Sequence, residues 1–214
     1  MTKLLRLTLL LCLSTFLCTC GPAQKESTGP TAVVGNIRYE ESPQILETSL
    51  TISPVTATAP AVLGTTLNPI TSMGVGHYRG RQQTEFPAVI DLSIPGQSGL
   101  VVRFSPPFAD SIPAVLSKSQ SVKIATMKNG LTDNENLVLF LEPKDRSTPK
   151  RILLQGPTST GILTLPKETM KDVKPGKYQA YLIKQQLQKD STSTLESSLQ
   201  TEYYTKSIPI EVKE

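Results

Sequence analysis

The sequence predicts an all-β protein with two β-sandwich-type domains, the C-terminal one immunoglobulin-like. Three observations support this prediction. The 17 prolines and 13 glycines divide the 214 residues into short segments, several segments alternate apolar and polar residues with a period of two, and no long helical periodicity is present. Such a pattern is typical of strands with one buried and one wet face.

We expect the first β domain to span residues 36–108. Its strands are predicted where apolar residues alternate or where a polar segment is bounded by turn residues. A loop is predicted at Thr56–Pro60. The expected strands are Gln44–Ile52, Val75–Gln83, Ala88–Ile94 and Leu100–Ser105.

The last two of these strands should form a hairpin. Ala88, Ile90, Leu92 and Ile94 share one face, and the residues between the strands, 95–99, read Pro-Gly-Gln-Ser-Gly. These are turn-forming residues. Prolines at 106 and 107 then end the ladder, because proline cannot donate a backbone hydrogen bond.

The second domain is expected at residues 109–214. Leu137–Leu141 is apolar on both faces and predicts a central strand. Gly156–Gly161 has the glycine spacing of a phosphate loop but lacks the lysine and the following helix, so we predict a hairpin turn there. The polar stretch Lys184–Gln200 is predicted to form the tip of the last hairpin. The other expected strands are Ser121–Thr126, Arg151–Leu154, Gly161–Leu165, Lys177–Gln185 and Gln200–Val212.

The segment from Leu163 to Leu182 resembles the crossover between sheets of immunoglobulin-like and fibronectin-type-III domains. It contains Pro175 and Gly176 ahead of a strand that carries Tyr178. The resemblance implies that Tyr178 is a tyrosine-corner residue, whose hydroxyl bonds back to the crossover backbone. The resemblance covers roughly the last hundred residues, and this part of the chain lacks the Cys and Trp of antibody domains.

The first twenty residues have the order of a secretory signal peptide. Lys3 and Arg6 precede an apolar run from Leu7 to Leu17, and small or polar residues follow. The run is too short to cross a bilayer core, which needs roughly 20 helical residues. We therefore expect residues 1–19 to be removed on export.

All three cysteines, Cys12, Cys18 and Cys20, lie in this segment. Leu17-Cys18-Thr19-Cys20 resembles a bacterial lipobox, which implies that Cys20 is acylated and becomes the first residue of the mature chain. Thr19 departs from the usual Gly, Ala or Ser, and Cys18 is a poorer candidate. An ordinary signal peptide with a soluble product is the alternative.

The mature chain also resembles Bacteroidota lipoproteins that end in an immunoglobulin-like domain, through Phe104–Pro107, Gly156–Thr158 and Glu202–Tyr204. This resemblance implies no particular activity. Residues 20–35 are expected to be a flexible tether. No Asp follows Cys20, so the signal that retains lipoproteins at the inner membrane is missing, and so is the acidic cluster of many surface-exported Bacteroidota lipoproteins. The resemblance therefore implies an outer-membrane lipoprotein in the cell envelope that faces the periplasm rather than the cell surface.

The composition of the mature chain limits the classes of partner that we expect it to bind. Loss of Lys3 and Arg6 leaves 20 basic and 18 acidic side chains in 195 residues, which argues against nucleic acid. Without a thiol beyond Cys20, the fold has no disulfide to stabilise it. The expected partners are the membrane, through lipidated Cys20, and an envelope protein or glycan.

The sequence contains no motif that predicts catalytic, cofactor-binding or metal-binding residues. His77 is the only histidine, so a triad or a transition-metal site would need it. We expect it on a solvated strand face. Thr132–Asn136 is oxygen-rich but lacks calcium-loop spacing, and predicts a polar turn. Two basic patches, His77–Arg81 and the lysines 167, 171, 174 and 177, are expected to be solvated surface.

The function predicted from these features is a non-enzymatic binding or scaffolding role in the envelope. One alternative is a glycan-binding accessory, or a hydrolase that uses carboxylates such as Glu85, Asp91, Asp133 and Glu135. The other is a subunit of an adhesion or secretion assembly.

Overall fold

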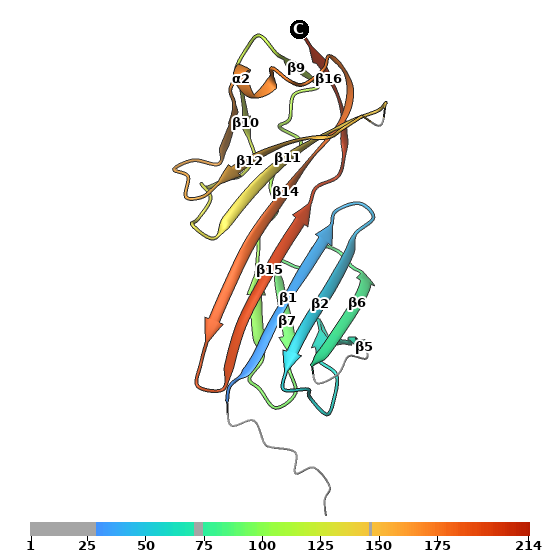
Figure 1. Cartoon of the computed structure of the whole chain (residues 1–214), viewed down its shortest axis with the longest axis vertical. Helices are drawn as coiled ribbons and strands as arrows, with labels where there is room; N and C mark the ends of the chain where they lie inside the picture. Colours follow the sequence, from blue (N-terminus) through green and yellow to red (C-terminus); the bar gives the residue numbers. More distant parts are fainter. Residues whose placement is uncertain (1–28, 71–74, 146) are drawn as a thin grey trace, which may run out of the picture.

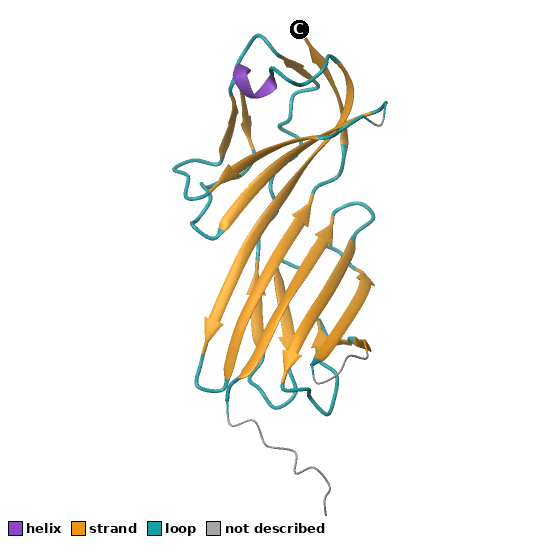
Figure 2. Cartoon of the chain, viewed as in Figure 1, coloured by secondary structure: helices purple, strands orange, loops and turns teal. Residues whose placement is uncertain are grey.

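The computed structural model describes residues 29–70, 75–145 and 147–214, and it confirms the all-β sandwich-type fold. In Figures 1 and 2 the described residues form strands almost throughout, together with the short helix α2 (Lys167–Met170). The signal peptide 1–19, Cys20 and residues 20–28 of the predicted tether lie outside the described residues.

A ten-stranded sheet runs the length of the molecule. Its main path is β12-β11-β14-β15-β1-β2-β6-β5, and β16 and β9 join it beside β14. The bounds are β1 (Thr31–Glu40), β2 (Ile45–Ser53), β5 (Asn68–Ile70), β6 (Gly76–Gln83), β9 (Val115–Ser117), β11 (Glu135–Pro143), β12 (Lys150–Gln155), β14 (Gly176–Ser191), β15 (Leu195–Tyr204) and β16 (Ile208–Lys213).

Two smaller sheets pack against this large sheet. The order β4-β3-β7-β8 forms one, and β10 with β13 forms the other. Their bounds are β3 (Ala61–Val62), β4 (Thr65–Thr66), β7 (Val89–Ser93), β8 (Leu100–Arg103), β10 (Val122–Ala125) and β13 (Ile162–Leu165). The result is two sandwiches, which we call the first and the second in chain order.

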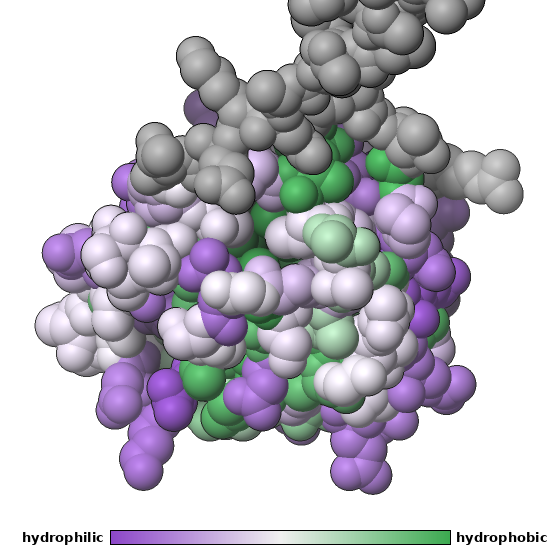
Figure 3. Space-filling model, turned by 90° about the horizontal axis from the view of Figure 1, so that it is seen from below, coloured by the Kyte–Doolittle hydropathy of each residue, from purple (hydrophilic) through white to green (hydrophobic). Residues whose placement is uncertain are grey.

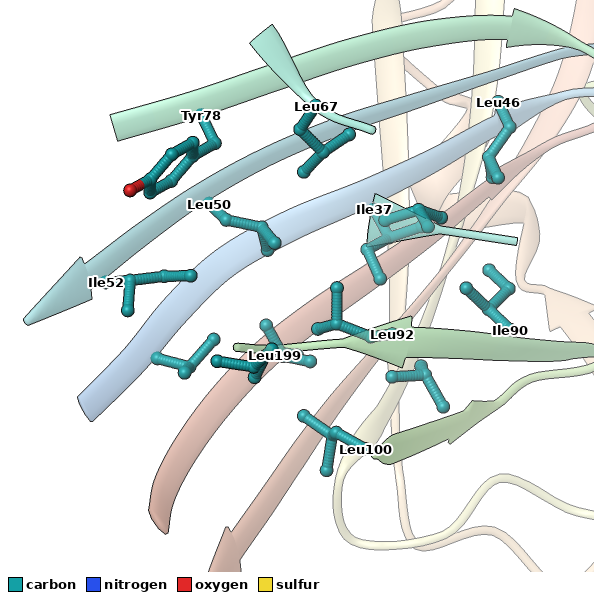
Figure 4. Close-up of a cluster of buried hydrophobic side chains, with 14 of the residues drawn as sticks. Ile37, Leu46, Leu50, Ile52, Leu67, Tyr78, Ile90, Leu92, Leu100 and Leu199 are labelled. Carbon is teal, nitrogen blue, oxygen red and sulfur yellow. The ribbon is translucent and has the colours of Figure 1, made fainter. Parts of the chain in front are cut away.

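Each sandwich has its own apolar core. In the first, Ile90, Leu92 and Leu100 of the small sheet point toward Ile37 and Leu50 of the large sheet (Figure 4). In the second, buried residues of β10 and β13 pack against those of β11 and β14. The period-two alternation of these strands buries one face of each, and such burial is worth roughly 1.5–3 kcal/mol per large apolar side chain.

Several predicted elements are confirmed. The hairpin is β7 and β8, paired from Val89–Arg103 to Leu92–Leu100. β11 lies between β12 and β14 as the expected central strand. The Tyr178 hydroxyl donates a hydrogen bond of 2.7 Å to the Lys174 carbonyl, as the tyrosine-corner resemblance implied.

The predicted tether is wrong over residues 31–35. These residues are the start of β1, paired with β2 and, in parallel, with β15. Val33 is fully buried in the first core. The strand was not predicted because residues 31–35 are mostly small or polar, and the face of the strand that is buried carries few large apolar side chains.

The stretch Lys184–Gln200 is also not mainly a tip. β14 continues to Ser191, β15 begins at Leu195, and the two strands pair residue by residue. Leu195 and Leu199 are buried in the first core. Although they belong to the predicted second domain 109–214, residues 195–204 therefore complete the first sandwich.

The segment Gly156–Gly161 is not a hairpin turn. It connects β12 of the large sheet to β13 of the two-stranded sheet, and so it crosses between layers. The Thr158 amide donates to the Leu131 carbonyl over 2.9 Å. A Cβ on Gly130 or Gly156 would collide with the facing backbone, so this crossover packs directly against the neighbouring loop.

Candidate functional site

The outer face of the first sandwich carries a row of charged side chains across neighbouring strands of the large sheet. Arg38 on β1 lies between Glu202 on β15 and Glu47 on β2, and Glu47 in turn faces Arg81 on β6. The inner faces of these strands are filled by the core. Charges of alternating sign therefore lie side by side on the solvent side.

A shallow hollow of ≈ 570 Å³ lies over this row. We call it the outer hollow. Its polar side chains come from five neighbouring strands of the large sheet, β15, β1, β2, β6 and β5. The outer hollow therefore depends on the order of these strands in the sheet. It is lined by Asn36, Arg38, Glu47, Thr48, Ser49, Asn68, Arg79, Gly80, Arg81 and Glu202.

The three guanidinium groups of the outer hollow differ in their partners. Arg81 Nε lies 3.2 Å from Glu47 Oε1, and Arg38 Nη2 lies 2.6 Å from Glu40 Oε1. Among the residues that the structure describes, Arg79 has neither a hydrogen bond nor an ion pair through its side chain. Its exposed guanidinium is thus free to meet a ligand.

Glu202 accepts several hydrogen bonds at the edge of the outer hollow. Gln185 Nε2 and Gln200 Nε2 donate to its Oε1 over 2.9 and 2.8 Å, and the Tyr204 hydroxyl donates to Oε2 over 3.2 Å. The Arg38 guanidinium lies 4.0 Å from the centre of the Tyr204 ring. Burial, followed by the charge of Glu202, raises the pKa of the Tyr204 phenol.

This arrangement is suited to binding. The two carboxylates in its wall, Glu47 and Glu202, already accept hydrogen bonds or an ion pair from the protein. Arg79, the amides of Asn36 and Asn68 and the hydroxyl of Ser49 offer donors and acceptors to a polar ligand.

An aromatic strip continues the same face into the second sandwich. The rings of Phe140 and Tyr181 stack at 5.0 Å with an interplanar angle of 5°, and the Arg151 guanidinium lies 5.0 Å from the Phe140 ring. The Tyr181 hydroxyl donates to Glu142 over 3.0 Å. Burial, together with this hydrogen bond, raises the pKa of Tyr181 to about 12.

His77 lies on β6 and is half-buried, with its Nδ1 3.0 Å from the Thr51 hydroxyl. A catalytic triad would need a third group that orients the imidazole. Within residues 29–70, 75–145 and 147–214, no carboxylate is hydrogen-bonded to this ring. The histidine pairs with a neighbouring strand, as a residue of a half-exposed face does.

In the oxygen-rich segment Thr132–Asn136, the carboxylate of Glu135 is buried and bonded to other protein groups. Glu135 Oε1 lies 2.7 Å from Lys184 Nζ, and Glu135 Oε2 accepts a 2.9 Å hydrogen bond from the Thr132 amide. Both oxygens are therefore occupied by protein donors. In the described part of the chain, no group of three or more potential metal-ligating side chains occurs.

The carboxylates considered for hydrolysis are scattered over the fold. Asp91 is exposed on β7 of the small sheet, and Glu85 lies after β6. Asp133 lies in the turn before β11, and Glu135 is the first residue of β11. Glu135 is committed to Lys184. Among the described residues, no hydrogen bond joins any two of the four carboxyl groups.

The two predicted basic patches have different outcomes. Tyr78 of the first patch is buried, whereas Arg79 and Arg81 line the outer hollow. From the second patch, Lys167 and Lys171 line a hollow of ≈ 380 Å³ at the far end of the second sandwich, which also contains Glu168 and Glu214. Opposite charges accompany the lysines there.

Cys20, the predicted site of lipid attachment, lies outside the described residues, as do Cys12, Cys18 and Thr19. Comparison with known proteins places no further residue: no protein-family model matches the sequence, and no curated protein is significantly similar to it. Among the described helices, none has the length and apolar character needed to span a bilayer.

The sequence did not predict that Asn36, Arg38, Glu47 and Glu202 are parts of one site. The signal was present in part, because the polar residues 36, 38 and 40 alternate with Ile37 and Tyr39. Convergence with Glu202 depends on the parallel pairing of β1 with β15. Strands so distant in sequence cannot be matched from alternation alone.

Proposed function

We propose that this chain is a lipid-anchored protein of the cell envelope with a non-catalytic binding or scaffolding role. In this proposal Cys20 carries the lipid, and the chain is held at the outer membrane facing the periplasm. The lipobox-like residues 17–20 and the short apolar run before them support the anchor.

The observation that supports the binding role is the outer hollow. It gathers polar side chains from five strands, leaves the Arg79 guanidinium free of described partners, and keeps its carboxylates engaged. Such a surface favours recognition of a polar envelope component over bond cleavage. A rigid sheet also suits a binding surface, because little order has to be created when a ligand binds.

The anchor is tested by labelling the chain with an alkyne fatty acid in cells. We expect wild type and Cys18→Ser to incorporate the label and to fractionate with membranes, whereas Cys20→Ser does neither. Unchanged labelling of Cys20→Ser would contradict the proposed lipid site.

The binding role is tested by site-specific photo-crosslinking in intact envelopes. A photoreactive residue at Asn68 reports on the outer hollow, and one at Ser119, near the end of the second sandwich, is the matched exposed control. We expect a discrete adduct from position 68 that is weakened by Arg79→Ala and retained in Arg103→Ala, a change at an exposed arginine on the small sheet. Adducts that are the same at both positions would contradict a specific role for the hollow.

A glycan is the ligand class that the hollow favours after a protein partner. Asn36, Asn68 and Ser49 provide the mixed amide and hydroxyl groups that sugar hydroxyls use. Binding of the purified chain to peptidoglycan sacculi and to lipopolysaccharide, with Arg79→Ala as comparison, distinguishes this candidate.

A further inference from the structure

The turns at one end of the first sandwich contain almost no charge. This end, which we call the tether end, is formed by residues 29–31, 53–61, 75–76, 93–100 and 190–195. Asp190 is the only charged residue among them, although 19% of the residues of the whole chain are charged.

Strand pairing places these turns together. Thr31 pairs with Leu195, Ala32 with Ser53 and Ile52 with Gly76 in the large sheet, and Ala61 pairs with Ser93 in the small sheet. A hydrogen bond of 2.9 Å from Gln97 Nε2 to Thr31 Oγ1 joins the two layers. The five segments are therefore one surface.

The tether end also exposes apolar side chains. Val55 is 53% exposed and Ile70, at the adjoining end of β5, is 42% exposed. Figure 3 looks at this end and shows pale and green residues over the middle of the surface, with purple, hydrophilic residues mainly around its rim. The remaining turn residues are chiefly Ser, Thr, Pro, Gly and Ala.

The opposite end of the molecule is different. The loops around α2 and the C-terminus carry Lys118, Lys167, Glu168, Lys171 and Glu214 around one hollow. Charged side chains resist transfer from water toward a lipid surface because their desolvation is costly, whereas hydroxyl and apolar groups resist it much less. The tether end, with Asp190 as its one charged residue, is thus the better suited of the two to lie against lipid.

The chain enters the fold at this same end. β1 begins at Thr31, and Cys20 precedes it by eleven residues. A chain of that length reaches at most about 40 Å when fully extended, and its root-mean-square span as a flexible linker is about 20 Å. The 16 residues of β14 alone cover about 50 Å, so the far end cannot lie as close to the anchor.

We infer that the tether end of the first sandwich rests on the lipid surface, with Val55 and Ile70 at the contact. This inference rests on the proposed lipidation of Cys20. It orients the long axis of the sheet away from the membrane and leaves the outer hollow open at the side. The core of the second sandwich extends along β14 only as far as Leu182, so that sandwich begins roughly 30 Å from the bilayer.

The test uses the full lipidated protein in phosphatidylethanolamine–phosphatidylglycerol vesicles. Because the mature chain has no thiol beyond Cys20, a single cysteine with a fluorescent label can be introduced as Val55→Cys. The matched control is Leu153→Cys on β12, whose side chain is 55% exposed in wild type. Flotation of the vesicles reports the anchor, and spin-labelled lipids report contact of the label with lipid.

We expect both variants to float, and the label at position 55 to be quenched by spin-labelled lipid several-fold more than the label at 153. Flotation with equal quenching would overturn the inference while the anchor stands. A label at 55 that is shielded from an aqueous quencher but not quenched by lipid would also overturn it, and would indicate a second copy of the chain on this surface. Loss of flotation in wild type would overturn the anchor, and this inference with it.

Discussion

Lys184 Nζ lies 2.7 Å from Glu135 Oε1, and the two side chains are only 6% and 10% exposed. The pair lies where the two sandwiches meet. Leu182, two residues before Lys184 on β14, belongs to the second core, and Tyr203, opposite Lys184 on β15, belongs to the first.

Lys184 also forms a hydrogen bond to the segment that links the two sandwiches. Its Nζ donates a hydrogen bond of 2.9 Å to Ser105 Oγ. Ser105 directly follows Phe104, which is buried in the first core. One ammonium group therefore holds β11, β14 and the connecting segment. A buried charge without such partners would be strongly unfavourable.

We predict that Lys184→Met destabilises the fold by about 3–5 kcal/mol, because it leaves the Glu135 carboxylate buried without its partner. The free energy of unfolding is measured with urea on the mature chain carrying Cys20→Ser. The double variant Lys184→Met, Glu135→Leu should recover most of the loss.

Glu47→Gln is the control for this prediction. It breaks the exposed pair of Glu47 with Arg81, whose side chains are 41% and 64% exposed, and should change stability by about 1 kcal/mol or less. An equal effect of the Lys184 and Glu47 variants would show that burial does not decide the strength of these pairs.

The same pair predicts a pH dependence. Burial raises the pKa of the Glu135 carboxyl, but the hydrogen bonds and charge of Lys184 and the hydrogen bonds of Thr132 outweigh it and hold that pKa below its ordinary value of 4.5. The folded state therefore binds the Glu135 proton less readily than the unfolded state does. This stabilisation is complete above the ordinary pKa and is lost as the pH falls through the lower, folded pKa.

We expect the urea midpoint of wild type to fall as the pH is lowered from 6 through the carboxyl range. In Glu135→Gln, which has no proton to gain at this position, the fall should be less steep, although that variant is less stable at pH 6. Parallel pH profiles for the two proteins would contradict the assignment of this titration to Glu135.

Local structure was predictable where the strands that pair are neighbours in sequence. The alternation of Ala88–Ile94 and the turn at 95–99 predict β7 and β8, and the structure has them as a hairpin. The partner of a strand is harder to predict. β1 pairs with β15 across more than 150 residues, and alternation identifies the buried face of each strand without naming its neighbour.

The candidate site follows the same rule. Arg79 and Arg81 were singled out because they lie close together in the sequence. Arg38, Glu47 and Glu202 join them only through the order of strands in the sheet. Their polar character fitted equally well with an exposed strand face, so sequence alone provided no reason to group them.

A third prediction follows because β15 is part of the first sandwich, although it lies near the end of the chain. Leu199 is 1% exposed and belongs to the first core. Leu199→Ala should lower the free energy of unfolding by about 2–5 kcal/mol, because it leaves a cavity in that core. The control is Leu187→Ala on the outer face of the same hairpin, where the side chain is 37% exposed.

Limited proteolysis should show which sandwich is affected by Leu199→Ala. We expect new cleavage in the first sandwich, although residue 199 follows the whole of the second along the chain. Cleavage confined to residues 109–175 would contradict the placement of β15 in the first core.

The tyrosine corner gives the last prediction. The Tyr178 hydroxyl donates to the Lys174 carbonyl over 2.7 Å, and the ring is 6% exposed in the second core. Tyr178→Phe keeps the ring but leaves that carbonyl without its donor, and should cost about 1–2 kcal/mol. Tyr181→Phe removes an exposed hydroxyl contact with Glu142 and should cost less. Thermal unfolding followed by circular dichroism compares the two, and a larger loss for Tyr181→Phe would show that the corner bond does not hold the crossover to β14.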